Sequence, residues 1–329
     1  MSGKLRLSIV GYGIMGERLL RAALDHAADF VSISGVWDPS ADAMARLGRD
    51  LPQVKQAQSA AALLDNADVL YVASPPASHL GYVGAALDRG LAVFCEKPFA
   101  IDVAEAQAFL DQHGPRTSRI AVNFPFASSL GVQQLRAWLA EDAIGQPERL
   151  AIEVGFAHWP RPWQMDAESW LDRRQQGGFV REVVSHFLFL ASRLGGQLEL
   201  LPGHQVSYPQ ADLSERSLSA SLRAGDLPLS LQGAVGSTDK PDHNLFTLTG
   251  PRGAIRLRDW AVAERQDAAG HWQPAPDAMP NEKARPLVLR HQLEKLARLS
   301  RGEAETGFPL ASAAEAFAVQ RVVETLLKG

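Results

Sequence analysis

A glycine-rich turn near the start of the chain narrows its possible folds more than any other feature. Residues 11–16 read GYGIMG, follow the apolar run 5–10 and precede a helical pattern over residues 15–27. A short apolar run rich in β-forming residues predicts a buried strand. The spacing G-x-G-x-x-G between such a strand and a helix is typical of the first βαβ unit of a dinucleotide-binding fold.

Each position of this turn has a role if it binds a pyrophosphate. Gly11 permits the tight turn, Gly13 lets the backbone approach the phosphates, and Gly16 allows close packing of helix on strand. The first helical N–H groups, at Ile14 and Met15, would face the anion. The alternative is a glycine-rich turn that binds nothing, and the strand–turn–helix setting makes it the weaker interpretation.

An acidic residue follows the second predicted strand, which covers residues 30–37. Asp38 lies 22 positions after Gly16, where a carboxylate accepts hydrogen bonds from the adenosine ribose and repels a 2′-phosphate. No arginine directly follows Asp38, although Arg46 could lie nearby. We therefore expect NAD as the favoured cofactor, with NADP possible. Asp38 could instead simply begin an Asp-Pro turn.

The first third of the chain alternates strand-like and helix-like segments. Such alternation predicts a doubly wound parallel sheet, so residues 1–123 are expected to form a Rossmann domain. The expected strands are 5–10, 30–37, 69–73, 91–95 and 119–123, and the expected helices are 15–27, 41–47, 59–64, 79–89 and 102–113. Asp102 is well placed to cap the last of these helices.

The pattern changes after residue 123, and residues 124–329 are expected to form a substrate and oligomerisation domain. Strand-like runs follow one another without intervening helices, which predicts an antiparallel or mixed sheet. The expected strands are 150–157, 217–224, 229–235, 245–249 and 254–257, the expected helices are 130–141, 179–194, 287–301 and 311–327, and a proline-rich surface loop is expected over 266–286. The terminal helix can pack back on the first domain.

Charged residues close the fourth predicted strand. Glu96, Lys97 and Pro98 follow the apolar run 91–95, and charge does not belong inside a buried strand. In an open parallel sheet, ligands bind at the carboxyl ends of the strands. Glu96 and Lys97 are therefore expected at the cofactor edge, and a surface lysine is the weaker alternative for Lys97.

The third predicted strand, 69–73, should end at the same edge. Ser74 and Pro75 begin its loop and His79 ends it, so these three residues are also candidates for cofactor binding. For His79 we expect a role in orienting the loop rather than in the chemistry.

The helix predicted over residues 179–194 is apolar on nearly every side but carries Glu182 and His186. Residues four apart share one face of a helix, and buried charge is costly unless it is paired or used. These two side chains are therefore expected to line a pocket, with a structural ion pair as the alternative. Histidine suits acid–base chemistry, and Lys97 suits stabilisation of an alkoxide. Which of Lys97 and His186 transfers the proton is open, and Glu182 could orient His186 or bind a substrate hydroxyl.

Tryptophans and arginines precede this helix and offer a substrate surface. Trp159 and Trp163 could stack on a ring, and Arg173 could bind a carboxylate or hydroxyls. A core anchor with solvated arginines is an equally weighted alternative. For Arg181, a salt bridge elsewhere is weighed equally with a substrate contact. Asn123, at the end of the fifth predicted strand, is a further candidate for substrate binding.

Composition excludes several classes of function. The formal net charge of −4 indicates no nucleic-acid partner, and no stretch approaches the ~18 apolar residues of a membrane span. The single cysteine, Cys95, cannot form an intramolecular disulfide and is expected to be a small buried residue. We expect a cytoplasmic protein. The nine histidines show no metal-ligand spacing, so no metal site is expected.

Several motifs in order resemble one family. The glycine motif at 11–16, Ser-Pro-Pro-x-x-His at 74–79, Glu-Lys-Pro at 96–98 and the Gly-Gly…Glu…His series over 177–186 together resemble the glucose–fructose oxidoreductase / inositol dehydrogenase / MocA (Gfo/Idh/MocA) family. The resemblance implies a Rossmann domain and a C-terminal α/β domain with a large, open-faced, mostly antiparallel sheet. It also implies a dimer or tetramer formed through that face, and a Glu-Lys-Pro segment beside the nicotinamide, with Pro98 often cis.

Three positions depart from the family pattern. Glu182 stands where the family has aspartate, Val184 stands where it has glycine, and the arginine often found after Asn123 is missing. These departures concern the substrate side of the site rather than the fold.

The sequence thus predicts an NAD(P)-dependent dehydrogenase or reductase with a small-molecule substrate. It would transfer a hydride between the nicotinamide and a hydroxyl or carbonyl carbon of a sugar, polyol or related cyclic compound, with Lys97, His186 and Glu182 as catalytic residues. One alternative is a redox-neutral lyase or glycosidase that retains its NAD. Another is a nucleotide-binding regulator that has lost catalysis.

Overall fold

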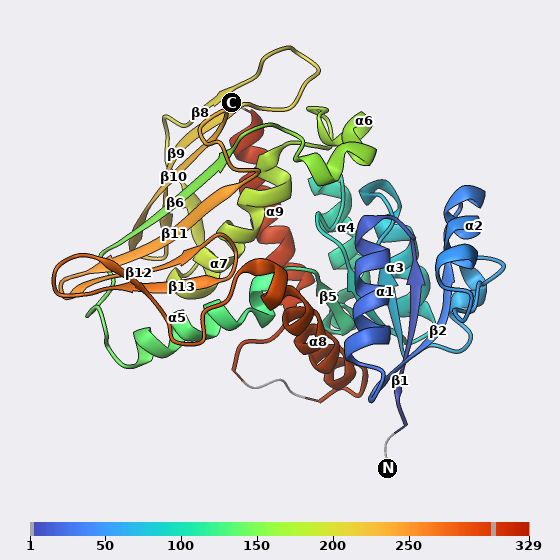
Figure 1. Cartoon of the computed structure of the whole chain (residues 1–329). Helices are drawn as coiled ribbons and strands as arrows, with labels where there is room; N and C mark the ends of the chain where they lie inside the picture. Colours follow the sequence, from blue (N-terminus) through green and yellow to red (C-terminus); the bar gives the residue numbers. More distant parts are fainter. Residues whose placement is uncertain (1–2, 304–306, 329) are drawn as a thin grey trace. The chain divides into compact units, whose positions relative to one another are not determined.

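The structure is a computed structural model that describes residues 3–303 and 307–328 (Figure 1). The chain folds as two compact units: the first runs to Ser128 and resumes over Arg285–Phe317, and the second comprises Ser129–Ala284 and the chain from Ala318 onward. The domain boundary predicted after residue 123 stays a prediction, because compactness alone does not establish which segments fold independently.

A six-stranded sheet forms the centre of the first unit, in the order β15-β5-β4-β3-β1-β2. Strands β1 to β5 pair in parallel, and β15 pairs antiparallel with β5. The strands are β1 (Leu5–Val10), β2 (Val31–Trp37), β3 (Val69–Val72), β4 (Ala92–Cys95), β5 (Ile120–Val122) and β15 (Ala311–Ser312). Every residue of β3, β4 and β5 is buried, as expected for a sheet covered on both faces. The doubly wound parallel sheet predicted from the sequence is confirmed.

Helices connect the parallel strands of this sheet. They are α1 (Ile14–His26), α2 (Ala41–Asp50), α3 (His79–Asp88) and α4 (Val103–His113), and a single 3₁₀ turn at Ala61–Leu63 replaces the helix predicted over 59–64. Asp102 caps α4 as predicted, because one carboxylate oxygen accepts hydrogen bonds from the backbone N–H groups of Ala104 and Glu105 at 2.7 and 2.9 Å.

The helix α8 (Asn281–Ser300) contributes to the first unit from Arg285 onward. Leu293 and Leu296 are fully buried in the same apolar cluster as the residues of β1. The helix begins six residues before the predicted start at 287 and contains Pro286. The prolines predicted a loop as far as residue 286, but Pro286 is the sixth residue of the helix, where proline removes one intrahelical N–H donor without ending the helix.

A nine-stranded sheet forms the centre of the second unit, in the order β14-β13-β12-β11-β6-β10-β9-β7, with β8 also paired to β9. The pair β6·β10 is parallel, and the other described pairs of this sheet are antiparallel. The strands are β6 (Arg149–Phe156), β7 (Leu198–Leu200), β8 (Gln205–Ser207), β9 (Ser217–Ala224), β10 (Leu227–Val235), β11 (His243–Gly250), β12 (Gly253–Arg258), β13 (Val262–Gln266) and β14 (Trp272–Pro274). The predicted mostly antiparallel sheet is confirmed.

One face of this sheet is covered and the other is open in the chain. Along β9, Leu218, Ala220 and Leu222 are buried, whereas Ser219 and Ser221 are exposed. The helices of this unit are α5 (Leu130–Ala140), α6 (Glu168–Leu171), α7 (Ser185–Gly195) and the part of α9 (Ala313–Lys328) from Ala318 onward. Self-association through the open face stays a prediction.

The loop predicted over residues 266–286 is wrong in part. Residues 272–274 form β14, which pairs with β13 across a turn, and residues from 281 onward are helical. Asp267 closes this turn, because its carboxylate accepts hydrogen bonds from the N–H groups of Ala269 and His271, each at 2.9 Å. Pro274 and Pro276 lie at or just beyond the end of the ladder, where no N–H is needed, and Pro286 lies in α8.

None of the described helices is both long enough and apolar enough to cross a membrane.

Candidate functional site

The glycine turn of the first unit is packed against the neighbouring strand loop. Gly11 has φ of +96°, and a Cβ there would lie 2.6 Å from backbone atoms of Ala73 and Ser74. A Cβ on Gly16 would overlap the carbonyl oxygen of Gly11. Both positions therefore require glycine for contacts within the chain itself.

Gly13 differs from the other two glycines of the turn. It is exposed, its φ is an ordinary −81°, and a Cβ there would meet no atom of the described chain within 4 Å. The backbone of this chain therefore does not require glycine at this position. Gly13 is also the N-cap of α1 and supplies no side-chain cap to the first helical N–H groups, which include those of Ile14 and Met15. An anion that approaches the backbone closely fits both observations.

Asp38 lies beside the glycine turn. One carboxylate oxygen accepts a hydrogen bond from the backbone N–H of Tyr12 at 2.7 Å, and the other accepts one from Ser40 at 2.8 Å. Each oxygen keeps further acceptor capacity. The side chain is thus held at the end of β2 with a fixed orientation, as a residue that binds ribose hydroxyls must be.

His79 joins the loops that follow β3 and β4. It is fully buried, and its two ring nitrogens lie 2.8 Å from the carbonyl oxygens of Ser74 and Pro98. Burial lowers the pKa of the imidazole, although both backbone contacts oppose that effect. The histidine therefore ties two loops together at the carboxyl edge of the sheet. Pro75, next to Ser74, is exposed at this edge.

Buried polar side chains hold the end of β4. Glu96 is 8% exposed, and one of its oxygens accepts hydrogen bonds from the Tyr71 hydroxyl and, at 2.6 Å, from the Asn123 amide. The Asn123 carbonyl accepts in turn from Gln292 at 2.7 Å. Burial and the Glu96 charge raise the pKa of Tyr71 well above its ordinary value, so this hydroxyl stays a donor. We call Tyr71, Glu96, Asn123 and Gln292 the β4 polar network.

Lys97 directly follows this network. It is half-buried, and its peptide bond to Pro98 is cis, as the resemblance implied. The network therefore fixes the backbone from which Lys97 extends. Asn123, predicted as a substrate-binding residue, has both ends of its amide engaged within the network.

The helix of the second unit that carries His186 is not a regular α-helix. Val180–Val184 form a π-helical turn that leads into α7, with the Ser185 N–H bonded to the Val180 carbonyl five residues back. The prediction of one α-helix over 179–194 is wrong here, whereas the shared face predicted for Glu182 and His186 stays a prediction. Glu182 is half-buried rather than buried, whereas His186 is 7% exposed. Single π turns inside helices are frequent at functional sites.

Glu215 holds the start of this π turn. It is fully buried, and its carboxylate accepts a hydrogen bond from the Val180 N–H at 2.7 Å. Gly178 has φ of +100°, and a Cβ there would overlap the same carboxylate. Burial raises the pKa of Glu215, and the Val180 hydrogen bond and the charges of Arg181 and Arg216 offset only part of that effect.

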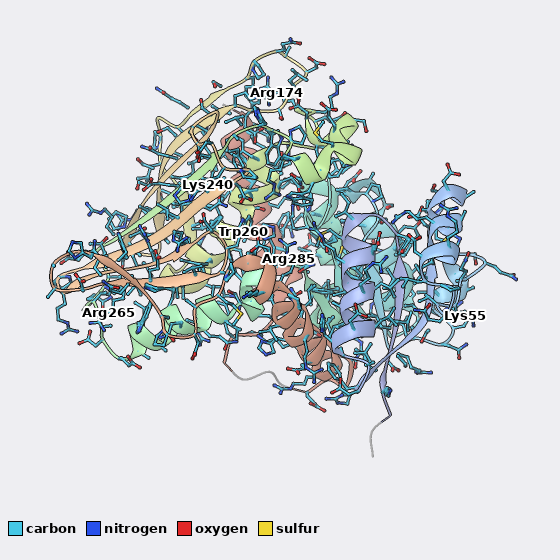
Figure 2. All side chains as sticks on the ribbon, in the orientation of Figure 1. Lys55, Arg174, Lys240, Trp260, Arg265 and Arg285 are labelled. Carbon is cyan, nitrogen blue, oxygen red and sulfur yellow. The ribbon has the colours of Figure 1, made fainter. Side chains whose placement is uncertain are left out.

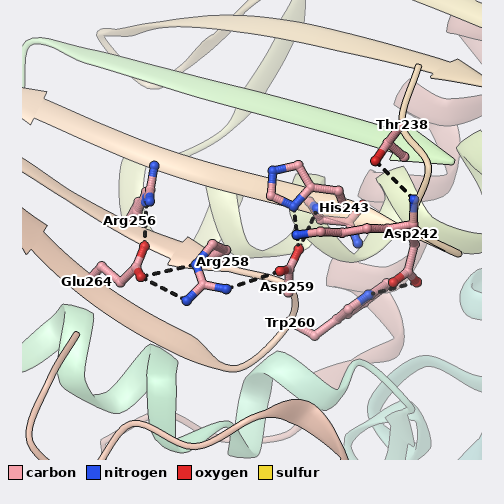
Figure 3. A network of polar contacts seen from close by, with 10 residues as sticks. Thr238, Asp242, His243, Arg256, Arg258, Asp259, Trp260 and Glu264 are labelled. Atoms are coloured by element: carbon pink, nitrogen blue, oxygen red, sulfur yellow. Dashed lines mark hydrogen bonds and ion pairs between the residues drawn. The ribbon is translucent and has the colours of Figure 1, made fainter. Parts of the chain in front are cut away.

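A three-residue turn between β12 and β13 places an indole beside His186. Asp259 and Trp260 both have positive φ, of 47° and 73°, although neither is glycine. The Asp259 carboxylate accepts hydrogen bonds from the Asn244 N–H at 3.1 Å and from His243 Nδ1 at 2.8 Å (Figure 3). The Trp260 and His186 rings meet edge to face, with centroids 5.4 Å apart.

An ion pair supports the other edge of this indole. Trp260 Nε1 donates to Asp242 at 3.3 Å (Figure 3). The same carboxylate oxygen pairs with Arg161 at 2.8 Å. Arg161 is 6% exposed and also donates to Gln164 at 2.8 Å. The second unit thus brings His186 together with Trp260, Asp242 and Arg161, a group we call the His186 cluster. The sequence did not single out Trp260 or Asp242.

The tryptophans predicted to bind substrate have different surroundings. Trp159 is 7% exposed and packs against Phe156 and Phe179, so the core-anchor alternative describes it. Trp163 is 42% exposed, and the Arg161 guanidinium lies over its ring, 4.7 Å from the ring centroid. Trp163 therefore extends the His186 cluster toward its exposed side.

The two arginines predicted to bind substrate, Arg173 and Arg181, form ion pairs with carboxylates of the chain. Arg181 forms a two-point ion pair with Glu324 at 2.7 and 2.8 Å and donates to the carbonyls of Arg174 and Gly177 at 2.8 Å. Arg173 is exposed in a shallow surface pocket and pairs with Asp212 at 2.6 Å. Their substrate contacts stay predictions, and the contacts of Arg181 favour its structural alternative.

Comparison with known proteins identifies a family model and several relatives. Residues 5–124 match the family model of Gfo/Idh/MocA, described as an oxidoreductase family with an NAD-binding Rossmann fold. The chain is similar to UDP-N-acetylglucosamine 3-dehydrogenase of Acidithiobacillus ferrooxidans (26% identity over 165 residues, 49% of each chain). It is also similar to inositol 2-dehydrogenase of Acidothermus cellulolyticus (33% identity over 151 residues, 44% of this chain and 42% of the other). The matched stretches cover between 27% and 49% of the curated relatives' own lengths.

The whole fold has solved counterparts. An oxidoreductase from Agrobacterium radiobacter, solved with NAD⁺, L-tartaric acid and magnesium, superposes with a TM-score of 0.81 at 19% identity. The match covers 99% of this chain and 96% of the other. At that identity the similarity establishes the fold, with its Rossmann-like sheet and its second, mostly antiparallel sheet.

The β4 polar network generates a stability prediction. Tyr71→Phe removes only the hydroxyl, and leaves the buried Glu96 carboxylate with one donor fewer. We expect the free energy of unfolding, measured with urea, to fall by about 1–3 kcal/mol. Tyr82→Phe removes the same group from a half-buried tyrosine of α3 and should change the free energy of unfolding by less than about 0.5 kcal/mol. Equal losses in both variants would contradict the role given to Tyr71.

Glu215 generates a pH prediction. Its folded pKa lies above the unfolded value, so its contribution to stability is present at low pH and is lost as pH rises through the folded pKa. Glu215→Gln keeps an acceptor for Val180 without the charge. The melting temperature of this variant, minus that of wild type, should therefore increase between pH 5 and 8. Glu199→Gln, at an exposed position, is the control, and a flat difference for Glu215→Gln would refute the prediction.

Proposed function

We propose that this chain is a nicotinamide-dependent dehydrogenase or reductase. The reason is that residues 5–124 match the NAD-binding Rossmann fold of the Gfo/Idh/MocA oxidoreductase family. Its substrate would be a hydroxyl or carbonyl compound of the sugar, polyol or related cyclic class. The observation that carries the proposal is Gly13, a glycine that no contact within the described chain requires, at the start of a helix with no side-chain cap.

The residues of the first unit fit a dinucleotide. Gly13 and the N–H groups of Ile14 and Met15 would hold the pyrophosphate. The Asp38 carboxylate, fixed by two backbone N–H groups, would accept the adenosine ribose hydroxyls and repel a 2′-phosphate, which supports NAD over NADP. When bound, the nicotinamide supplies the hydride acceptor or donor.

The roles of the reacting groups follow from their surroundings. Lys97 extends from a backbone held by the β4 polar network and would stabilise the negative charge that develops on the substrate oxygen. In the second unit, His186 would exchange a proton with a substrate hydroxyl, with Trp260 fixing its ring. The choice of proton acceptor between Lys97 and His186 stays open. Glu182, half-buried on the π turn, would bind a substrate hydroxyl.

The His186 cluster supports a substrate with a ring and hydroxyl groups. The indoles of Trp260 and Trp163 offer apolar faces, and Arg161 and Asp242 offer charge at their edges. Such a mixture of aromatic surface with a few polar groups is typical of small-molecule sites. The names of the relatives agree with this class, since they act on inositol and on a nucleotide sugar.

Gly13→Ala tests the cofactor site. The added Cβ meets no described atom of the chain, so the melting temperature should change by only a few degrees. It would stand where the pyrophosphate must approach, so NADH affinity, measured by fluorescence titration, should fall at least about tenfold. Gly81→Ala adds a Cβ in similarly open surroundings on α3 and should bind NADH as wild type does. If wild type binds neither NADH nor NADPH, the proposed function fails.

Lys97→Met tests the assignment of chemistry. Turnover would be followed by the absorbance of reduced nicotinamide with a panel of inositols, sugars, nucleotide sugars and polyols. We expect kcat to fall by about 100-fold or more with any substrate that wild type accepts. Lys55→Met removes the same charge from an exposed position of the first unit (Figure 2) and should leave kcat unchanged. A Lys97→Met enzyme that binds NADH and turns over as wild type would overturn the role of Lys97.

A further inference from the structure

A second charged side chain reaches the glycine turn. Arg46, on α2, donates from Nη2 to the Tyr12 carbonyl at 2.6 Å, and its guanidinium lies 4.5 Å from the centroid of the Tyr12 ring. The Arg46 side chain is 37% exposed, so one side of it faces solvent. Arg46 is therefore a cation within reach of any ligand at this turn.

Tyr12 brings Arg46 close to Asp38. The Tyr12 N–H donates to Asp38 at 2.7 Å, while the carbonyl of the same residue accepts from Arg46 at 2.6 Å. Two opposite charges thus contact the backbone of one residue. If Asp38 binds the ribose hydroxyls, the Arg46 guanidinium stands beside the position that a 2′-phosphate on that ribose would occupy.

Glu17 holds this guanidinium from a third side. Its carboxylate pairs with Arg46 Nη1, and its other oxygen pairs with Arg21 at 2.8 Å. Burial acts to raise the pKa of the Glu17 carboxyl, but the hydrogen bonds from Arg21 and Arg46 outweigh it and lower the pKa, so the group is ionised at neutral pH. A single partly exposed ion pair is weak, but the Tyr12 carbonyl and ring fix Arg46 at the same time.

We propose that Glu17 is a specificity-determining residue. Its ion pair with Arg46 prevents that guanidinium from binding the 2′-phosphate of NADP. The inference rests on the proposed function, since it needs a dinucleotide at this turn. Arginine is the residue best suited to bind a phosphate by two parallel hydrogen bonds. With Nη1 held by Glu17, the Arg46 charge is already paired, and it therefore offsets less of the repulsion between Asp38 and a 2′-phosphate. Discrimination between the cofactors would then depend on Glu17 as well as on Asp38.

Glu17→Gln is the variant that tests this role. It keeps the size of the side chain and removes the charge, so that the neutral amide holds Arg46 Nη1 less strongly while the Tyr12 carbonyl still positions the guanidinium. The measured quantity is the ratio of NADPH affinity to NADH affinity, from fluorescence titrations of the full chain with each cofactor. A charge-assisted contact to phosphate should raise this ratio at least about tenfold.

Two further variants make the test specific. Asp25→Asn removes the same charge from an exposed position on α1, eight residues away, and should leave both affinities as in wild type. In the double variant Glu17→Gln/Arg46→Gln, the gain in the ratio should disappear, because Arg46 supplies it. If Glu17→Gln does not fold, as judged by circular dichroism, Glu17→Ala replaces it with the same expected gain.

Each outcome decides the inference. A ratio that rises in Glu17→Gln and returns to the wild-type value in the double variant supports it. An unchanged ratio overturns it, and so does a gain that persists without Arg46, because the charge of Glu17 alone would then be responsible. NADH binding by wild type separates the two proposals: if NADH binds and the ratio does not respond, the inference fails and the proposed function stands.

Discussion

Close packing of two glycines on neighbouring backbone is the constraint on which the ligand edge of the first unit depends. Gly11 lies against the Ala73–Ser74 backbone, and Gly16 lies against Gly11. These contacts seat the start of α1 on the ends of β1 and β3 without an intervening side chain. The backbone of Tyr12 is consequently fixed, so its N–H and its carbonyl can act as anchors for side chains from elsewhere in the unit.

The same edge is stiffened by polar groups that are buried and paired. His79 ties the loops after β3 and β4 together, and the β4 polar network joins β3, β4, β5 and α8 through hydrogen bonds. A buried carboxylate such as Glu96 would destabilise the fold if it had no hydrogen-bond donors. The donors from Tyr71 and Asn123 offset that cost and hold the carboxylate in one position. Lys97 directly follows Glu96, so the backbone from which its side chain extends is held in place.

The sequence predicted the parts of this molecule that depend on local pattern. The strands at Leu5–Val10 and Ser217–Ala224 have the predicted bounds, and the resemblance to the Gfo/Idh/MocA family is confirmed for residues 5–124. Periodicity could not reveal the π turn at Val180–Val184, whose first residue donates a hydrogen bond to Glu215, a residue distant in the sequence. The rule that proline ends a helix placed the start of α8 too late.

Site residues were predictable where a motif or a strand end marked them. Tyr71 had a weak signal, as a hydroxyl inside an otherwise apolar strand, whereas Trp260 had none. Turn positions with positive φ favour glycine, asparagine or aspartate, and an Asp-Trp pair does not suggest two such positions in a row. Arg46 was noted only as a possible neighbour of Asp38, since a helix position says little about which loop a long side chain reaches.

The turn that carries Trp260 shows how the second unit holds an unfavourable local conformation. A tryptophan with φ of 73° is disfavoured by its own backbone, so surrounding contacts must enforce it. Asp259 supplies them through His243 and Asn244, and Asp242 fixes the indole. A glycine would relax the turn but would leave no ring against His186. Tryptophan does not stabilise the turn itself. The consequence of the strained conformation is that it positions the Trp260 ring against His186.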